Sequence, residues 1–150
     1  MIEVGCPSPD DTRALARRLA SLVRPADVLL LKGPLGAGKT VFAGGLAEGL
    51  GVQEQVTSPT FVLTRRYDGF MPLVHADLYR IGSSAEIEDL DLLAEAVSGL
   101  LVVEWGDVVE NQFGADHLVV DIIPDDDETR HIRLIPHGTW CDRPLDEVSA

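Results

Sequence analysis

Cysteine, aromatic residues and basic charge are all scarce in this chain, and each shortage argues against a class of protein. Only two of the 150 residues are cysteines, Cys6 and Cys141. They lie at opposite ends of the chain, so a disulfide framework and a cysteine-based zinc site are both disfavoured. Aromatic residues make up 5% of the chain, and no surface for stacking RNA bases is evident. We expect two free thiols in a reducing compartment.

The shortage of basic residues restricts the partners of this protein. Asp and Glu outnumber Lys and Arg by 25 to 12, which gives a formal net charge of −13. Proteins that hold nucleic acid unaided usually present a basic face, because neutralisation of phosphates drives their non-specific binding. Independent binding of tRNA or DNA is therefore disfavoured, whereas docking onto a basic protein partner is compatible with this charge.

Long hydrophobic runs are also missing. No apolar stretch reaches the roughly 18 residues of a membrane span, and the first residues, Met1 to Gly5, lack the pattern of a signal peptide. We expect a cytoplasmic protein without membrane association. The length and the apolar fraction of 45% predict one globular domain over residues 1–150.

The most informative pattern that is present lies between Gly33 and Thr40. These eight residues read Gly-Pro-Leu-Gly-Ala-Gly-Lys-Thr and match the phosphate-binding pattern G-x-x-x-x-G-K-[ST]. The apolar run 28–31 before them predicts a buried strand, and residues 40–50 after them predict a helix. A strand, a glycine loop and a helix in this order are the structural setting in which the pattern binds phosphate.

Each fixed position of this pattern has a chemical role. The glycines let the backbone turn tightly and direct amide N–H groups inward, and the helix N-terminus adds partial positive charge. Lys39 is expected to reach the β- and γ-phosphates, and the hydroxyl of Thr40 is expected to bind Mg²⁺.

Turnover of a nucleotide also needs carboxylates near the metal, and two acids follow apolar strands. Glu104 comes directly after residues 100–103, and Asp77 follows residues 73–76. The carboxyl ends of parallel strands carry the ligands in open α/β sheets. Either acid is a candidate metal ligand, with the other polarising the nucleophile. The segment 57–61, with its hydroxyls, is interpreted either as a switch loop or as a turn.

The remaining elements complete an α/β fold with a mostly parallel central sheet. We expect a short strand at 2–4, a helix capped by Ser8, a strand at 60–67 and a hairpin into residues 73–75. A helix beginning at Ser83 or Ser84, a buried strand at 100–103 and an antiparallel hairpin of 117–123 with 129–135 follow. The tail from Pro136 is expected to be loosely ordered or capped by a short helix.

Four motifs in register resemble one family. They are Leu-Gly-Ala-Gly-Lys-Thr at 35–40, Ser-Pro-Thr-Phe at 58–61, His-x-Asp-x-Tyr-Arg at 75–80 and Glu-Trp at 104–105. Together they resemble the TsaE family of bacterial ATPases needed to form threonylcarbamoyladenosine in tRNA. The resemblance covers nearly the whole chain and implies a three-layer P-loop NTPase-like fold.

The resemblance also implies a role for particular residues. ATP would be bound by the backbone from Leu35 to Thr40 (Leu35, Gly36, Ala37, Gly38, Lys39 and Thr40), with Thr40 and Glu104 binding Mg²⁺. Asp77 would be the acid that turnover requires, and Trp105 would lie near the nucleotide unless it is a buried structural residue. Asp11, Thr12 and Arg130 would border the adenine. Val41 replaces the second threonine common in the family; its amide remains a donor but the hydroxyl is lost.

The resemblance further implies a slow, Mg²⁺-dependent ATPase that acts on a complex of TsaD and TsaB and meets tRNA only indirectly. No arginine is clearly aimed at the γ-phosphate, so Arg80 or a partner's arginine would have to serve. A small-molecule or nucleoside kinase is an alternative, although no arginine-rich lid is evident. A GTPase is disfavoured, because the chain has no Asn-Lys-x-Asp stretch to recognise guanine. A nucleotide-gated assembly module is a further alternative.

Overall fold

The computed structural model describes residues 1–34, 36–57, 64–78, 91–104, 113–125 and 128–149. Seven strands in these ranges form one sheet: β1 (Ile2–Cys6), β2 (Asp27–Lys32), β3 (Thr64–Tyr67), β4 (Leu73–Asp77), β5 (Leu100–Glu104), β6 (His117–Pro124) and β7 (Arg130–His137). The α-helices are α1 (Pro9–Leu19), α2 (Lys39–Gly49) and α4 (Leu92–Glu95). Three short 3₁₀ helices are η1 (Ala20–Leu22), η3 (Gly138–Asp142) and η4 (Leu145–Ser149).

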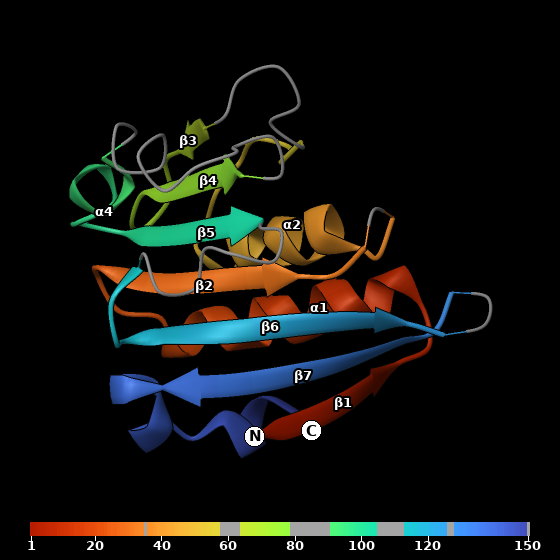
Figure 1. Ribbon diagram of the computed structural model, residues 1–150. Helices are drawn as coiled ribbons and strands as arrows, with labels where there is room; N and C mark the ends of the chain where they lie inside the picture. Colours follow the sequence, from red (N-terminus) through yellow and green to blue (C-terminus); the bar gives the residue numbers. More distant parts are fainter. Residues whose placement is uncertain (35, 58–63, 79–90, 105–112, 126–127, 150) are drawn as a thin grey trace.

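The sheet is mixed, with a parallel centre. Its strand order is β1-β7-β6-β2-β5-β4-β3 (Figure 1). Strand β2 pairs in parallel with β5 and β6, and β5 pairs in parallel with β4. The outer pairs, β1 with β7, β7 with β6, and β3 with β4, are antiparallel. This architecture confirms the expected α/β class, including the mostly parallel centre and the C-terminal hairpin.

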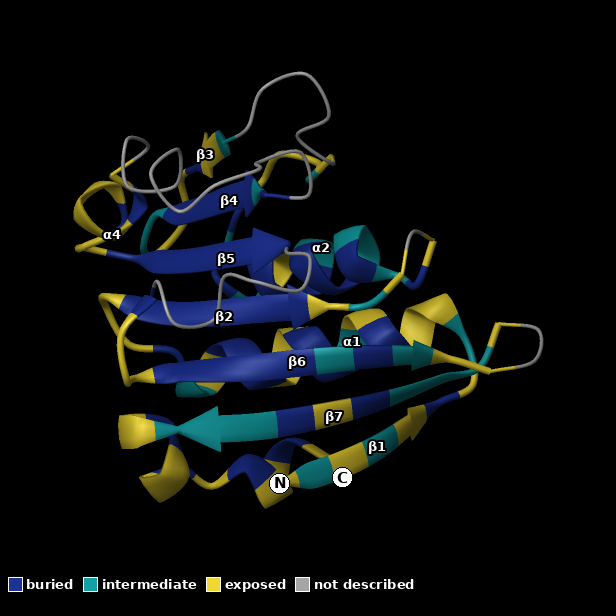
Figure 2. Ribbon diagram, in the orientation of Figure 1, coloured by how far each residue is buried: buried dark blue, intermediate teal, exposed yellow. Residues whose placement is uncertain are grey.

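The central strands are apolar on both faces, as continuous hydrophobic runs require in a parallel sheet. All five residues of β5 are buried, and so are the first five of β2. Figure 2 shows this burial along β2 and β5, whereas β1 alternates between intermediate and exposed positions and β7 is mostly intermediate or buried. Because β2 is covered by neighbours on both edges and both faces, the loop that leaves it starts from a rigid support.

Helices α1 and α2 lie together behind the sheet in the view of Figure 1. Their apolar residues share one core with one face of the central strands, including Leu29, Leu31 and Val102. The alternate strand residues, such as Leu30 and Val103, form a second core with Leu92 and Ala96 from α4 and the residue that follows it. The described helices therefore cover both faces of the sheet.

Helix α1 begins as its sequence predicts. Ser8 is the N-cap, Pro9 is the first helical residue, and Asp11 completes a capping box. The Asp11 carboxylate accepts hydrogen bonds from the Ser8 backbone N–H at 3.1 Å and from the Ser8 hydroxyl at 2.7 Å. These bonds satisfy polar groups that a helix N-terminus otherwise leaves without partners.

Most expected elements are confirmed within about two residues at each end. The hairpin through Asp68 and Gly69 forms, since β3 pairs with β4 in antiparallel register. The first strand is longer than expected and extends to Cys6. The start of the strand expected at 60–67 and most of the helix expected from Ser83 or Ser84 lie outside the described residues.

The expectation of a loosely ordered tail after Pro136 is wrong. Trp140 in η3 is fully buried, and Leu145 and Val148 in η4 join the main core. The guanidinium of Arg143 donates a 2.9 Å hydrogen bond to the buried carboxylate of Asp27 and lies 4.0 Å from the centre of the Trp140 ring. The alternative expectation, a short helix, is closer to the structure, in which the tail forms the 3₁₀ helices η3 and η4. The many glycines, prolines and charged residues of the tail gave no sign that its few apolar side chains are buried.

None of the helices in the described residues is both long enough and apolar enough to cross a membrane.

Candidate nucleotide-binding site

The glycine loop of residues 33–38, named the phosphate loop after its sequence pattern, connects the carboxyl end of β2 to the start of α2. Gly36 and Gly38 have φ angles of 78° and 107°, in the left-handed region that residues with a Cβ rarely adopt. These two glycines turn the chain so that α2 begins at Lys39. The sequence therefore places glycine where the backbone of the loop requires it.

The N-terminus of α2 differs from that of α1 in its capping. Gly38 occupies the N-cap of α2 and provides no side-chain hydrogen bond. The first amide groups of a helix lack acceptors within the helix and carry partial positive charge. This end of α2 is therefore suited to an anion, as in other glycine loops that precede a helix.

Lys39 is buried, with 6% of its surface exposed, and its ammonium group lies against the loop. Its Nζ donates hydrogen bonds to the carbonyl oxygens of Gly33 at 2.6 Å and Pro34 at 3.2 Å. A buried ammonium needs such acceptors because removing its hydration is costly. The side chain is thus folded over the loop, with its charge at the loop's inner side.

Arg130 approaches the same loop from the start of β7. Its Nε donates to the carbonyl oxygen of Ala37 at 2.8 Å, and its Nη2 donates to that of Gly36 at 3.4 Å. These bonds connect residues 93 and 94 positions apart in sequence. The C-terminal hairpin therefore supports the phosphate loop directly.

A cleft of about 190 Å³ lies beside the loop. It is lined by Pro9, Thr12, Gly36, Ala37, Gly38, Val41 and Arg130. The structure thus brings Thr12, Val41 and Arg130 together beside the loop, although they come from three different elements. Asp11 does not line this cleft and instead caps α1.

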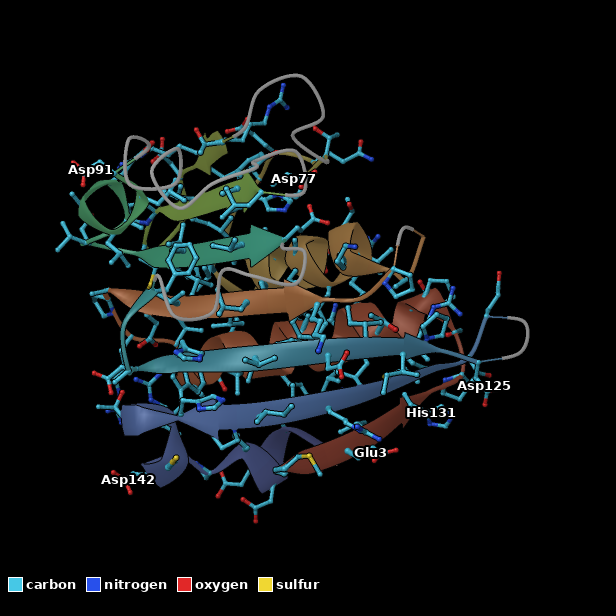
Figure 3. All side chains as sticks on the ribbon, viewed as in Figure 1. Glu3, Asp77, Asp91, Asp125, His131 and Asp142 are labelled. Carbon is cyan, nitrogen blue, oxygen red and sulfur yellow. The ribbon has the colours of Figure 1, made fainter. Side chains whose placement is uncertain are left out.

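The two candidate acids are neighbours at the carboxyl ends of the parallel strands β4 and β5. Asp77 ends β4, Glu104 ends β5, and the two are register partners. Glu104 is also the register partner of Leu31, two residues before the loop. Figure 3 shows Asp77 at the same end of the sheet from which the loop leaves β2.

One residue of this site was not singled out from the sequence. His75 is fully buried, and its Nε2 lies 2.8 Å from Oε2 of Glu104. His75 is part of the His-x-Asp-x-Tyr-Arg motif, but it lies 29 residues from Glu104 in sequence. No helix or strand periodicity relates two residues at that separation. Only the pairing of β4 with β5 brings them together.

Several predicted residues have no described placement. Leu35, Trp105, Arg80 and the segment 58–61 lie outside the described residues. Thr57 precedes that segment; its hydroxyl accepts a hydrogen bond from Arg65 Nη1 at 3.0 Å, and its backbone N–H donates to the Tyr67 hydroxyl at 3.3 Å.

The residues present fit a magnesium nucleotide. Within the described part of the chain, no three His, Cys, Asp or Glu side chains are grouped to hold a metal. Mg²⁺ bound to nucleotide phosphates does not require such a group, because it uses one or two protein oxygens together with phosphates and water. The hydroxyl of Thr40 and the carboxylate of Glu104 are oxygens of this kind.

Comparisons with known proteins show which family the chain is similar to. A family model described as "Threonylcarbamoyl adenosine biosynthesis protein TsaE" matches residues 6–132. Proteins named tRNA threonylcarbamoyladenosine biosynthesis protein TsaE are 38% identical in Bacillus subtilis, over 95% of this chain and 90% of the relative, and 47% identical in Streptomyces coelicolor, over 84% and 90%. The crystal structure of YdiB from Bacillus subtilis superimposes with a TM-score of 0.81 at 34% identity, covering 99% of this chain and 93% of that one. On the strength of these matches, the chain belongs to the TsaE family.

Proposed function

We propose that this protein is a Mg²⁺-dependent ATPase that serves the formation of N6-threonylcarbamoyladenosine in tRNA. The observation that carries the proposal is the uncapped N-terminus of α2 behind the glycine loop, with Lys39 folded over the loop and Glu104 at the neighbouring strand end. The names of the relatives support the biosynthetic role, since they refer to the same tRNA modification.

Triphosphate binding would use the main chain of residues 35–40 and the ammonium of Lys39. Phosphate oxygens would take the place of the carbonyl oxygens of Gly33 and Pro34 as acceptors for Nζ. Such an exchange is favourable because a charge-assisted bond to phosphate is stronger than one to a neutral carbonyl. The cleft lined by Thr12, Val41 and Arg130 would receive the adenosine.

The chemistry of turnover would depend on Thr40, Glu104 and Asp77. Thr40 and Glu104 would hold Mg²⁺, which would neutralise charge on the phosphates while the γ-phosphoryl group is transferred to water and ADP is released. Asp77 is partly exposed at the neighbouring strand end and would orient the attacking water. Intrinsic hydrolysis should be slow, because the sequence identifies no arginine finger for the γ-phosphate.

We further propose that ATP hydrolysis acts on a complex of TsaD and TsaB rather than on tRNA itself. The net charge of −13 supports a protein partner, because an acidic surface repels the phosphates of tRNA. The threonylcarbamoyl transfer would belong to that complex.

Calorimetry with ATP and Mg²⁺ tests the site directly. The chain contains two lysines, Lys39 and the exposed Lys32, which provide a matched pair of substitutions. Lys39→Ala should weaken binding by at least about tenfold and abolish hydrolysis, since it removes the charge that faces the phosphates. Lys32→Ala removes the same charge outside the loop and should leave affinity within about twofold. Equal effects of both substitutions would refute the assigned role of Lys39.

Hydrolysis measured with and without the TsaD–TsaB complex tests the partner. A higher rate in the presence of the complex is the expected result, and identical rates would contradict partner activation. Asp77→Ala should retain nucleotide binding and complex formation while turnover and tRNA modification are lost. Full modification by that variant would instead favour an assembly module gated by nucleotide binding alone.

A further inference from the structure

Two buried polar side chains meet between strands β4 and β5. His75 has no exposed surface, Glu104 has 3% exposed, and Nε2 of His75 lies 2.8 Å from Oε2 of Glu104. Buried carboxylates are rarely tolerated without such a partner. The imidazole contacts Oε2, which leaves Oε1 for another ligand.

Strand register places this pair on the side of the sheet that faces α2. His75 pairs with Val102 and Asp77 pairs with Glu104 in parallel β4 and β5. Side chains two residues apart on a strand share a face, and Val102 belongs to the core formed with α1 and α2. The carboxylate of Glu104 is therefore on the face from which α2 and its N-terminal Lys39 and Thr40 extend.

The surroundings of His75 identify the atom that carries the proton. Its other ring nitrogen, Nδ1, is buried and has no hydrogen-bond partner within the described residues. An ionised carboxylate can only accept hydrogen bonds. The ring nitrogen that faces Glu104, Nε2, therefore carries a hydrogen and donates it to the carboxylate.

From this arrangement we infer that His75 is a positioning residue that orients Glu104 for Mg²⁺; the inference rests on the proposed magnesium–ATP site. The imidazole donates to Oε2 and restricts rotation of the carboxylate, so Oε1 is directed consistently toward the metal. Partners of this kind, one bond away from the metal, tune its affinity because they fix the geometry and basicity of the ligand.

The test measures how nucleotide binding depends on Mg²⁺ in the full-length protein. A fluorescent ATP analogue is titrated in excess EDTA and then over a range of Mg²⁺ concentrations, with thermal unfolding recorded for each variant. His75→Leu should raise the Mg²⁺ concentration at half-maximal effect by about 10- to 100-fold, while affinity in EDTA stays within about twofold. His75→Gln, whose amide nitrogen can replace Nε2 as donor, should recover most of the loss.

His117→Leu is the matched control. His117 is also buried in a strand of the sheet, at the start of β6, and its Nδ1 lies 3.0 Å from the carbonyl oxygen of Gly114. This variant should change thermal stability without moving the Mg²⁺ midpoint. If His75→Leu does not fold, His75→Asn replaces it, because the shorter amide places its nitrogen near the position of Nδ1 rather than Nε2.

The outcomes separate this inference from the proposed function. If the wild-type protein binds the nucleotide no better with Mg²⁺ than in EDTA, the proposed magnesium–ATP site is overturned. If the wild-type midpoint is measurable but folded His75→Leu or His75→Asn leaves it unchanged, His75 does not position the ligand. A parallel loss of affinity in EDTA and in Mg²⁺ would likewise show a general structural role and overturn the inference.

Discussion

At the scale of single residues, the chemistry of this protein depends on how each side chain is surrounded. Lys39 and Thr40 are recognisable because they occupy fixed positions of a short motif. His75 becomes informative only beside Glu104, and Asp11, which the family resemblance places near adenine, accepts two hydrogen bonds from Ser8. A residue's type limits what it can do, and its neighbours determine which of those possibilities applies.

The two cysteines should differ in reactivity for the same reason. Burial raises the pKa of the Cys6 thiol, with Asp11 acting in the same direction and Thr12 and Arg18 opposing it. Cys6 is 2% exposed, whereas Cys141 is exposed. Because the thiolate is the reactive form, iodoacetamide at pH 8 should modify Cys141 alone in the folded protein and both thiols in urea. Mass spectrometry of the labelled peptides measures this, and rapid native labelling of Cys6 would contradict the burial.

At the scale of elements, two glycines allow α1 and α2 to pack closely. A Cβ at Gly45 would lie 2.4 Å from the carbonyl oxygen of Arg13, and one at Gly49 would lie 2.7 Å from the carbonyl oxygen of Arg17. Glycine thus permits a backbone approach that any larger residue would prevent. Close packing also determines the cleft, since α1 supplies Thr12 and α2 supplies Val41.

Adjacent substitutions in α2 should therefore have opposite effects. Gly44→Ala places a Cβ in open space, because no atom lies within 4 Å, and should stabilise the protein by up to about 1 kcal/mol through helix propensity. Gly45→Ala should destabilise it by about 1–3 kcal/mol, because the clash with α1 exceeds that gain. Urea unfolding of both variants compares them directly, and equal stabilisation would show that the helices can separate without cost.

At the scale of the whole molecule, the C-terminal segment secures the strand that carries the phosphate loop. Arg143 and Asp27 form a buried ion pair, and Arg143 Nη1 also donates to the carbonyl oxygen of Leu22 at 3.1 Å. Arg18 Nε donates to the carbonyl oxygen of Val148 at 2.7 Å. These contacts join the end of the chain to α1 and to the start of β2.

Removal of this buried pair should be far more costly than removal of a surface pair. Arg143→Met should reduce the free energy of unfolding by about 3–5 kcal/mol, because Asp27 would keep a buried charge without its partner. Arg133→Met breaks only the half-exposed contact with Glu3, at 3.6 Å, and should change stability by no more than about 1 kcal/mol. Urea denaturation of both variants measures the difference, and a similar small effect for each would show that Asp27 is relieved in another way.

Much of the fold was predictable because its signals are local. The runs at 28–31 and 100–103 are apolar without interruption, as doubly covered strands are, and Ser8 and Pro9 provide a standard helix start. The tail after Pro136 was harder, since its glycines, prolines and charges resemble those of a loop. The tail is ordered because Trp140 is buried and Arg143 bonds to Asp27 and Leu22, which are more than 100 residues away in sequence. The composition of a segment does not reveal contacts of this kind.

The glycine loop, the two strand-end acids and the family could all be predicted from residue types at short or fixed spacing. The contact of Glu104 with His75, the support of the loop by Arg130 and the cleft shared by Thr12 and Val41 became visible only in the folded chain. The physical reason is that β-sheet pairing and helix packing join residues far apart in the chain, and those contacts arise from folding rather than from any local pattern.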